Sequence, residues 1–248
     1  MGNLWCRDLP TVDVPKRDTP KPVTLVLPYY ENARFFEFQM DGWAQYPDDL
    51  KRHVSVIVVD DGSPNSAAER VIEQGRPFPV RLFRIEVDIR WNWLAARNIG
   101  MHHAAEGWCV LTDMDHVISP EVMRAVVYGE HDPDTVYAFH REEHTGEPAN
   151  PHSASFLMTR EMFWRIGGYD ETLSGFYGSD GDWRRRVAAV APIALLPQRL
   201  IRYEYVDDSS TTAYLRKQPE DAAVKGLIAQ RGKKWRPKVL SFPYHEVA

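Results

Sequence analysis

Apolar residues recur along the chain in short runs that are separated by longer amphipathic stretches. Residues 23–27 and 54–59 are almost entirely apolar, which is the pattern of strands buried on both faces of a sheet. Residues 33–46 gather aromatic side chains on one face, which predicts a helix packed on that sheet. The alternation continues with a helix over 66–74, a strand over 80–87, a helix over 92–105 and a strand over 108–111. Strands that alternate with helices indicate crossover units, so we expect an α/β fold with a mainly parallel sheet.

After residue 111 the alternation is less regular. The pattern predicts helices over 120–128 and 160–166, strands over 136–140 and 155–158, and then a Gly-rich loop. Residues 141–152 are polar and contain Gly146, Pro148 and Pro151, which predicts an exposed and mobile loop. Pro219 at a first helical position and Gly232 after the last turn bracket one more helix.

Composition and charge narrow the class of protein. The chain has 248 residues, of which 44% are hydrophobic and 26% charged, so it is long enough for one globular core and is neither disordered nor fibrous. The formal net charge of -5 gives no overall attraction for nucleic acid or an anionic membrane, so such a partner needs a local patch. Residues 225–238 carry six cations, no acid and Trp235. This patch is either a solvated face or a contact for an anionic acceptor, a lipid-linked phosphate or a nucleic acid.

The cysteines and the N-terminal segment bear on location. Cys6 and Cys109 are far apart and lack metal-ligand spacing, which excludes a disulfide framework and favours a reducing, cytoplasmic setting. Residues 1–22 mix charges with prolines and do not resemble a signal peptide. No apolar run approaches the roughly 20 residues that cross a bilayer, so we expect no stable membrane insertion.

Polar residues follow four of the predicted strands. Ligands bind beyond the carboxyl ends of the strands in open parallel sheets, and the four polar clusters are residues 29–32, 60–63, 86–88 and 112–116. Each cluster alone could form a turn, but their concentration at one edge of the sheet indicates a binding site. Asp113 and Asp115 follow a buried strand one residue apart, and this pair of carboxylates suits a divalent cation that also holds substrate phosphates.

Five segments carry a resemblance to a known family. They are VTLVLPYYEN at 23–32, VSVIVVDDGS at 54–63, AARNIGMHHA at 95–104, WCVLTDMDHVISPE at 108–121 and FLMTREMFWRIGGYDETLSGFYGSDGDWRRR at 156–186. In this order they resemble glycosyltransferases of the GT-A fold, close to family 2, and the last segment also resembles a galactosyltransferase motif. The resemblance implies one open, mainly parallel twisted sheet flanked by helices. It also implies transfer of a hexosyl or N-acetylhexosaminyl group from a nucleotide-sugar, usually a UDP-sugar, with Mn²⁺ or Mg²⁺.

The resemblance also implies roles for individual residues and for two halves of a single domain. Residues 1–22 would be a leader, 23–118 the nucleotide-sugar-binding half and 119–248 the acceptor-binding half of the domain 23–248. The nucleoside would be surrounded by Tyr29, Glu31, Asp60 and Asp61. Arg97 would lie near the pyrophosphate or sugar, Asp113 near the ribose or metal, and Asp115 on the metal. Asp180 would be the catalytic base of an inverting reaction, with Asp182, Tyr177 and Trp183 at the acceptor. The acceptor would be a glycan, a glycolipid, a small molecule or a modified nucleic acid.

The sequence departs from the family pattern at two points. Ser179 stands where the family usually has Glu before the base, and Gly181 follows the base. GT-A enzymes also commonly supply a late His as a third metal ligand, and no His lies between His152 and His245. Tyr203, Glu204 or His245 could take its place, or water could.

Two other functions stay open at this stage. Asp113 and Asp115 also fit the nucleophile strand of a haloacid-dehalogenase-type phosphohydrolase, with Asp207 and Asp208 as its later metal pair. Against it, such enzymes resemble one another in opening with that strand, whereas three strand-helix units come first here. A GT-A-shaped binding module without turnover is the second alternative, because Ser179 replaces Glu and the late His is missing.

Overall fold

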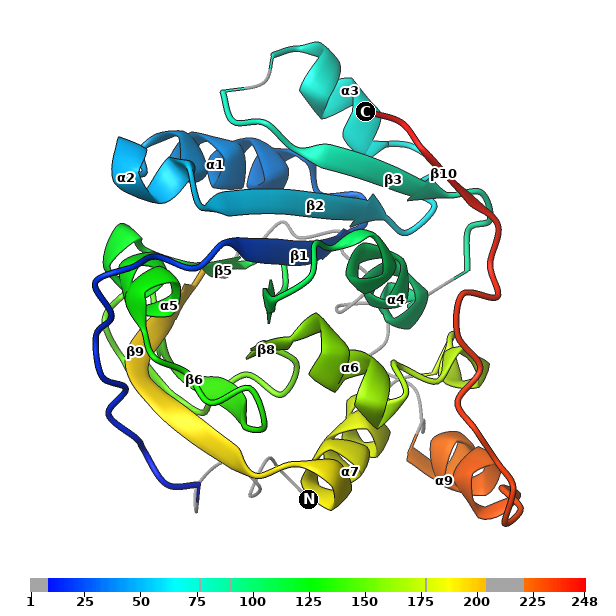
Figure 1. Ribbon diagram of the computed structural model, residues 1–248. Coiled ribbons are helices and arrows are strands. Elements are labelled where there is room, and N and C mark those ends of the chain that lie inside the picture. The colour runs from blue at the N-terminus through cyan, green and yellow to red at the C-terminus, as the bar shows by residue number, and fades with distance from the viewer. Residues whose placement is uncertain (1–8, 76, 90, 177, 204–220) are drawn as a thin grey trace.

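The computed structural model describes residues 9–75, 77–89, 91–176, 178–203 and 221–248 (Figure 1). The first half contains β1 (Val23–Tyr29), α1 (Ala33–Ala44), α2 (Asp48–Lys51), β2 (Val54–Asp60), α3 (Ala68–Glu73), β3 (Arg81–Ile85), α4 (Trp93–His103) and β4 (Trp108–Leu111). The second half contains β5 (His116–Val117), α5 (Pro120–Tyr128), β6 (Val136–Glu143), β7 (Pro148–Ala149), β8 (Phe156–Thr159), α6 (Arg160–Ile166), η2 (Glu171–Leu173), α7 (Asp180–Val190), β9 (Ile193–Arg202), α9 (Asp221–Ala229) and β10 (Tyr244–Glu246).

A single twisted sheet runs through the described chain in the order β10-β3-β2-β1-β4-β8-β6-β9-β5, with β7 paired to β6. Strands β3, β2, β1 and β4 are parallel neighbours, as the strand-helix alternation predicts. In the second half β8 pairs antiparallel with both β4 and β6, and β5 pairs antiparallel with β9. The α/β fold is therefore confirmed, with a mixed sheet in which parallel pairing dominates only the first half.

Helices cover both faces of the sheet, and each face has its own apolar core. Successive residues of β1 alternate between the cores, because neighbouring side chains of a strand point to opposite faces. Leu25 and Leu27 pack with α1 residues such as Phe36, whereas Val26 packs with α4 residues such as Ile99. This burial on both faces explains the nearly continuous apolar runs in the sequence.

Helix α4 lies very close to the sheet at Gly100. A Cβ atom at this position would lie 2.4 Å from Val26 Cγ1 and 3.6 Å from Val59 Cγ2. Since no side chain fits between the helix backbone and β1, glycine sets the distance between the two elements. The same helix carries Trp93 and Arg97, which belong to the candidate site described below, so this contact also fixes their position.

The second half differs from the sequence prediction in three places. Residues 141–152 are not entirely a loop, because β6 continues to Glu143 and pairs with β7. Strand β9 was not predicted, because Pro197 interrupts its apolar run. The register with β6 shifts at this point, so that Phe139 pairs with Leu196 and His140 with Arg199. Residues 180–190, for which no element was predicted after the Gly-rich loop, form α7.

Both ends of the described chain pack against the domain. The segment 9–22, placed in the predicted leader, runs along β9 and α5, with Val12 N donating to Leu195 O at 2.9 Å and Arg17 N to Tyr128 O at 2.7 Å. Strand β10 pairs with the free edge of β3. The predicted start of the last helix at Pro219 lies outside the described residues. None of the described helices is long and apolar enough to cross a membrane.

The close contact at Gly100 gives a test of the fold. We expect Gly100→Ala to lower the free energy of unfolding by about 1–3 kcal/mol, because the added methyl group overpacks the α4–β1 contact. Urea denaturation measures this change. Gly226→Ala in α9 is the control, since nothing lies within 4 Å of a Cβ built there; equal destabilisation by both substitutions would contradict the packing argument.

Candidate functional site

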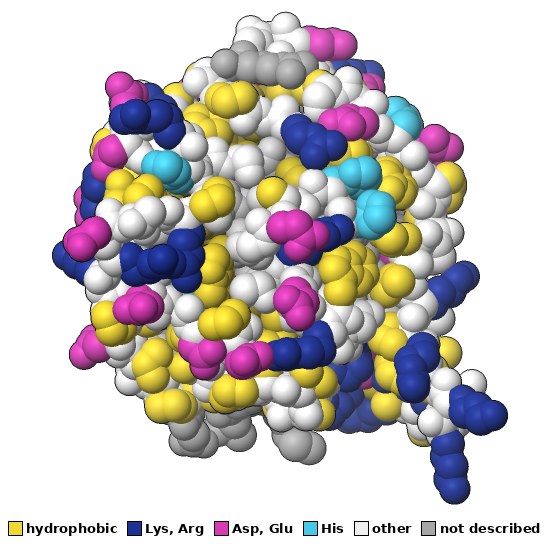
Figure 2. All heavy atoms as spheres, viewed as in Figure 1, with side chains coloured by type: hydrophobic (Ala, Val, Ile, Leu, Met, Phe, Trp, Pro, Cys, Tyr) yellow, Lys and Arg dark blue, Asp and Glu magenta, His cyan; other side chains and the backbone are white. Residues whose placement is uncertain are grey.

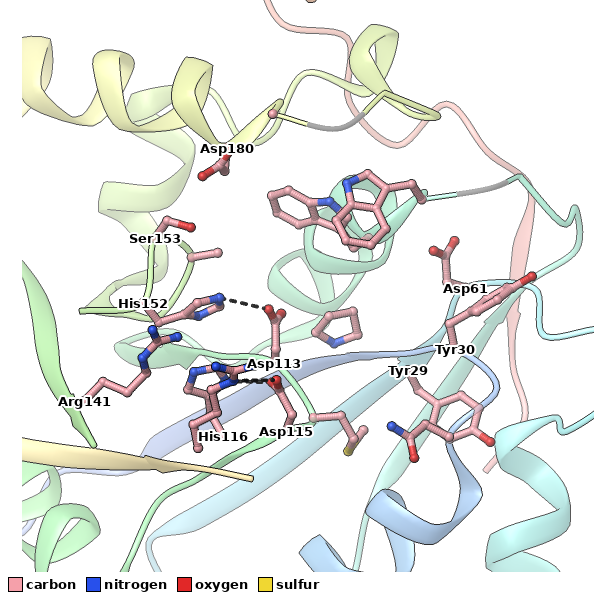
Figure 3. A pocket seen from close by; sticks show the side chains of 18 residues that line it. Tyr29, Tyr30, Asp61, Asp113, Asp115, His116, Arg141, His152, Ser153 and Asp180 are labelled. Carbon is pink, nitrogen blue, oxygen red and sulfur yellow. Dashed lines mark hydrogen bonds and ion pairs between the residues drawn. The ribbon is translucent and has the colours of Figure 1, made fainter. Parts of the chain in front are cut away.

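A pocket of about 400 Å³ opens beyond the carboxyl ends of β1, β2 and β4. Its walls come from both halves of the sheet and from the first residues of α4 and α7 (Figure 3). The lining residues are Pro28, Tyr29, Tyr30, Asn32, Asp61, Trp91, Trp93, Asp113, Met114, Asp115, His116, Arg141, His152, Ser153, Ala154, Gly178, Asp180 and Arg202. The edge predicted from the sequence is therefore the edge where the pocket lies.

The two carboxylates after β4 lie on the floor of the pocket. The side chains of Asp113 and Asp115 are 35% and 36% exposed, so each reaches the pocket while its base is held in the protein. Asp113 Oδ1 accepts a hydrogen bond from Arg97 Nη2, and Asp113 Oδ2 lies 3.3 Å from His152 Nε2. Asp115 Oδ1 lies 2.6 Å from His116 Nδ1, and its Oδ2 lies 3.9 Å from Arg202 Nε.

Asp115 is held as a carboxylate. Burial opposes its ionisation, but the neighbouring His116 and Arg202 outweigh this effect and lower the pKa of Asp115. Asp115 Oδ2 lies 3.9 Å from Arg202 Nε, whereas each carboxylate oxygen of Asp113 is closer than this to a nitrogen of Arg97 or His152. Asp115 therefore has a more accessible oxygen than Asp113. Of this pair, Asp115 is the better candidate for a metal ligand.

Two stacked imidazole rings support the carboxylates. The rings of His116 and His152 lie 4.2 Å apart at 24°, and each contacts one of the two aspartates, as the dashed lines in Figure 3 show. His152 Nδ1 lies 2.8 Å from Ser155 Oγ, which in turn lies 2.8 Å from Thr112 Oγ1. Burial lowers the pKa of His152 well below its usual value, so this ring is neutral and acts through hydrogen bonding.

Arg97 lies one layer behind the pocket and contacts Asp113 on its floor. It is fully buried behind Asp113 and does not line the pocket. Its guanidinium donates to Asp113, to Ala154 O at 2.5 Å and to Tyr169 Oη at 3.2 Å. The ring of Trp93 lies 4.8 Å from the guanidinium carbon. Arg97 therefore positions Asp113 from below, because its guanidinium is enclosed by these partners before it can reach the cavity.

The two acids after β2 have separate roles. Asp60 is buried and accepts from the backbone N–H groups of Ser63 and Ala68, both at 2.8 Å, so it shapes the turn rather than lining the pocket. Asp61 lines the pocket; its Oδ2 accepts from Asn92 N at 3.0 Å, while its buried Oδ1 has no hydrogen-bond partner among the described residues. Burial raises the pKa of Asp61 well above its usual value. Asp61 therefore offers an unsatisfied oxygen to a ligand.

Tyr29 and Glu31 also separate in the structure. Tyr29 lines the pocket with its ring, its hydroxyl donates to Ser66 O at 2.5 Å, and burial raises its pKa to about 12. Glu31 does not line the pocket, because its Oε1 accepts from Asn65 N at 2.8 Å and Ser66 N at 3.0 Å. These two hydrogen bonds hold the loop after β2. Glu31 has a positive φ of 51°, an unfavourable backbone conformation for a residue other than glycine.

Asp180 is the acid that faces the floor of the pocket from the opposite wall. It begins α7, and Figure 3 shows it across the cavity from Asp113 and Asp115. Its Oδ2 lies 3.2 Å from Arg184 Nη1, one helical turn further on, and the side chain is 27% exposed. Asp180 is thus placed where an acceptor hydroxyl could approach it.

The other residues proposed for the acceptor do not reach the pocket. Asp182 is buried, with its carboxylate 3.0 Å from Arg186 Nε and 2.5 Å from Arg231 Nη1. Trp183 is also buried, stacked on Tyr169 with ring centroids 4.3 Å apart. Both side chains point into the protein because they lie on the face of α7 that packs on the core. Tyr177 lies outside the described residues.

The described residues contain no group of three or more His, Cys, Asp or Glu side chains arranged to hold a metal ion. The donor set is therefore the carboxylate pair, which fits a hard divalent cation whose other positions come from substrate phosphates and water. His245 lies in β10, where it is paired with Arg84 of β3; its Nδ1 is 3.3 Å from Glu86 Oε1, and it is not part of the pocket lining. Tyr203 stacks on His144 and does not line the pocket, and Glu204 is outside the described residues.

Several residues that line the pocket were not among the predicted site residues. Arg141 and Arg202 come from β6 and β9, and His152 and Ser153 from the segment before β8. Arg202 could not be placed because β9 was not predicted. Trp91 and Trp93 also line the pocket.

The buried position of Asp182 gives a second test. Burial favours its neutral form, but Arg231 and Arg186 lower its pKa in the folded protein. The charged carboxylate therefore stabilises the fold above the unfolded-state pKa of about 3.9, and this contribution is lost as pH falls through the lower folded-state value. We expect Asp182→Asn to lower the free energy of unfolding by about 3–5 kcal/mol near neutral pH, because two arginines lose their buried anionic partner.

Urea denaturation across a pH series measures this difference, which should shrink as the acid limb is reached. Asp13→Asn is the control, since Asp13 is exposed. A difference that is the same at every pH would contradict the electrostatic explanation.

Comparisons with known proteins agree with this architecture. A family model described as Glycosyl transferase family 2 matches residues 44–188. A search of curated protein sequences found no match. The structure is similar to S. aureus TarS 1-349 solved with UDP-GlcNAc, with a TM-score of 0.65 at 16% identity over 84% of this chain and 65% of that chain.

A second similar structure is the mannosyltransferase PcManGT from Pyrobaculum calidifontis, in complex with GDP-Man and Mn²⁺. Its TM-score is 0.60 at 21% identity, over 89% of this chain and 68% of that chain. Another structure of TarS 1-349 matches with a TM-score of 0.60 at 16% identity, and there the match spans 60% of the TarS chain and 73% of this one. Nothing in these matches supports the phosphohydrolase alternative. With more than half of its residues matched by the family model and the fold shared with these structures, the chain belongs to glycosyltransferase family 2 and has the GT-A fold.

Proposed function

We propose that this protein transfers a sugar from a uridine diphosphate-linked donor to an acceptor hydroxyl, with a divalent metal and with inversion at the sugar carbon. One observation carries the proposal: Asp113 and Asp115 lie on the floor of the pocket, and Asp180 faces them from α7. A transfer reaction needs charge stabilisation at the leaving diphosphate and a base at the acceptor. The floor of the pocket would supply the first through the Asp113 and Asp115 carboxylates, and the opposite wall would supply the second through Asp180.

The donor would lie with its nucleobase beside Asp61. In Figure 3, Asp61 and Tyr30 lie at one end of the pocket and Arg141 at the other. The unsatisfied oxygen of Asp61 suits an N–H group on a base, and uracil offers N3–H; the ring of Tyr29 supplies an apolar wall. The ligands of the similar structures, UDP-GlcNAc and GDP-Man, support a nucleotide-sugar donor in general terms.

Asp115 would hold the metal together with the donor phosphates. When bound, Mn²⁺ or Mg²⁺ would neutralise the charge that develops on the departing diphosphate. Arg97 and His152 fix the neighbouring Asp113 through one oxygen each, so its carboxylate is oriented before the donor arrives. Asp113 would then contact the ribose or the metal without reorganisation of the floor.

Asp180 would act as the general base. As the acceptor oxygen forms its bond to the sugar carbon, the acceptor proton passes to the Asp180 carboxylate. The bond from that carbon to the diphosphate oxygen breaks, and its electron pair leaves with the nucleoside diphosphate. A single displacement of this kind inverts the configuration at the carbon. The 3.2 Å contact with Arg184 keeps the Asp180 carboxylate oriented between turnovers.

The division of labour follows the halves of the domain. Residues 23–118 would hold the nucleotide, and residues 119–248 would supply the base and the acceptor surface. The acceptor is a glycan, glycolipid, small molecule or modified nucleic acid, and the transferred group is a hexosyl or N-acetylhexosaminyl unit. A cytoplasmic location stays a prediction from the cysteine content.

Calorimetric titration with UDP, GDP, CDP and dTDP tests the donor and metal assignments. We expect UDP to bind most tightly with Mn²⁺ or Mg²⁺ and at least about 10-fold more weakly with a chelator, because Asp115 and the phosphates share the cation. Asp115→Ala should remove this metal dependence, while Asp13→Ala, at an exposed acid, should retain it. If none of the four diphosphates binds, the proposed donor class is wrong.

Asp180→Asn tests the base. We expect transfer to fall by about 10²–10⁴-fold because no group accepts the acceptor proton, while metal-dependent UDP binding stays close to that of the wild type. The measurement is UDP release from the donor in the presence of a mixed panel of acceptors, with calorimetry on the same preparation. Loss of UDP binding together with transfer would point to a structural role, and undiminished transfer would exclude Asp180 as the base.

A further inference from the structure

A cationic turn follows α9 and projects from the body of the protein. Its side chains Lys233, Lys234, Arg236 and Lys238 are all exposed, and we refer to these four residues as the cationic turn. Figure 2 shows Lys and Arg side chains gathered on a protrusion at the lower right, where the turn after α9 lies in Figure 1. Within the part of the chain that the structure describes, no ion pair joins any of the four to an acid. This charge is unusual in a chain with a formal net charge of -5.

Arg231 belongs to the same sequence patch but has a different role. It points inward, with Nη2 2.6 Å from Asp170 Oδ2 and Nη1 2.5 Å from Asp182 Oδ1. Its guanidinium carbon also lies 3.7 Å from the centroid of the Trp235 ring. Arg231 thus anchors the base of the turn and covers the aromatic ring, which leaves the four other cations to face outward.

We propose that the cationic turn docks this protein on the surface of an anionic lipid bilayer. A convex protrusion whose cations face outward fits a broad, flat anionic surface, where each such cation contributes to binding. A single nucleic-acid strand instead requires a groove with aromatic faces open for base stacking, and the Trp235 face is occupied by Arg231. The exposed large hydrophobic residues in the described chain, Phe38 and Val190, lie outside the turn. Binding is therefore electrostatic and peripheral, without insertion.

The anchor places this surface beside the candidate acceptor side of the pocket. Asp182, which binds Arg231, lies in the first turn of α7 together with Asp180. Lys238 N also donates to Asp170 Oδ1 at 3.2 Å, so the turn is fastened to the same layer at both of its ends. Because the rest of the chain is acidic overall, an anionic bilayer attracts this corner and repels the remainder. The protein would therefore bind in one orientation.

Vesicle co-sedimentation of the full chain tests the proposal. The probes are vesicles of phosphatidylcholine alone and of phosphatidylcholine with about 30% phosphatidylglycerol, each at about 0.05 M and about 0.5 M NaCl. We expect binding to the anionic vesicles at low salt only. The Lys233→Glu/Lys234→Glu variant should bind at least about 30-fold more weakly, since two cations near the surface are lost and replaced by acids.

Lys16→Glu/Lys51→Glu is the matched control, because it changes the net charge by the same amount away from the cationic turn. Lys16 lies in the N-terminal segment and Lys51 in α2. This control should bind like the wild type, and UDP titration of all three proteins verifies that the pocket is intact. Failure of the wild type to bind anionic vesicles would overturn the proposal, as would equal losses in both variants. Tighter binding to a single-stranded oligonucleotide than to the vesicles would assign the turn to nucleic acid instead.

Discussion

The buried guanidinium of Arg97 is the interaction on which the pocket floor depends. An isolated charge in the protein interior is strongly unfavourable, so the fully buried Arg97 requires a fixed anion, and Asp113 provides it. The same guanidinium also ties Ala154 O and Tyr169 Oη to α4. One side chain therefore joins the ends of β4 and β8 to the turn after α6. The site is rigid at this point because moving any partner would leave a buried charge uncompensated.

The two halves of the sheet contribute different chemistry. In the parallel half, the strands end together and place Tyr29, Asp61 and the carboxylate pair at one edge. In the second half, β8 runs antiparallel to β4, and β6 and β9 form a parallel pair; this half adds His152, Arg141 and Arg202 to the same pocket. The parallel half thus supplies most of the acids, whereas the second half supplies imidazole and guanidinium groups together with Asp180 on the opposite wall. Asp113 and Asp115 on the floor therefore lie beside the guanidinium groups of Arg97 and Arg202 before any ligand arrives.

Much of the parallel half could be predicted from the sequence, because buried strands and amphipathic helices have distinct periodicities. Residues 108–111, 120–128 and 160–166 form the expected elements with the expected bounds. The edge of the site was also predictable, since it follows from strand direction. What could not be predicted is which polar side chains turn inward. Asp60 and Asp182 have the residue types of a ligand site, yet backbone N–H groups satisfy Asp60, and Arg186 and Arg231 satisfy Asp182. Backbone N–H groups carry no residue-type signal, and Arg231 lies far from Asp182 in sequence, so neither arrangement leaves a pattern from which the inward orientation could be predicted.

The segment 9–22 has a consequence for the order in which the protein folds. Its backbone bonds to Leu195 and Tyr128 join one of the earliest parts of the chain to β9 and α5. Contacts between residues so far apart in sequence require closure of a very long loop, which is entropically costly and slow. During synthesis the bond from Arg17 can form only after α5 has left the ribosome, and the bond from Val12 only after β9 has. The strand-helix units from β1 to β4 contain local contacts and can assemble earlier, so the nucleotide side of the pocket would take shape before the segment that encloses β9 is fastened.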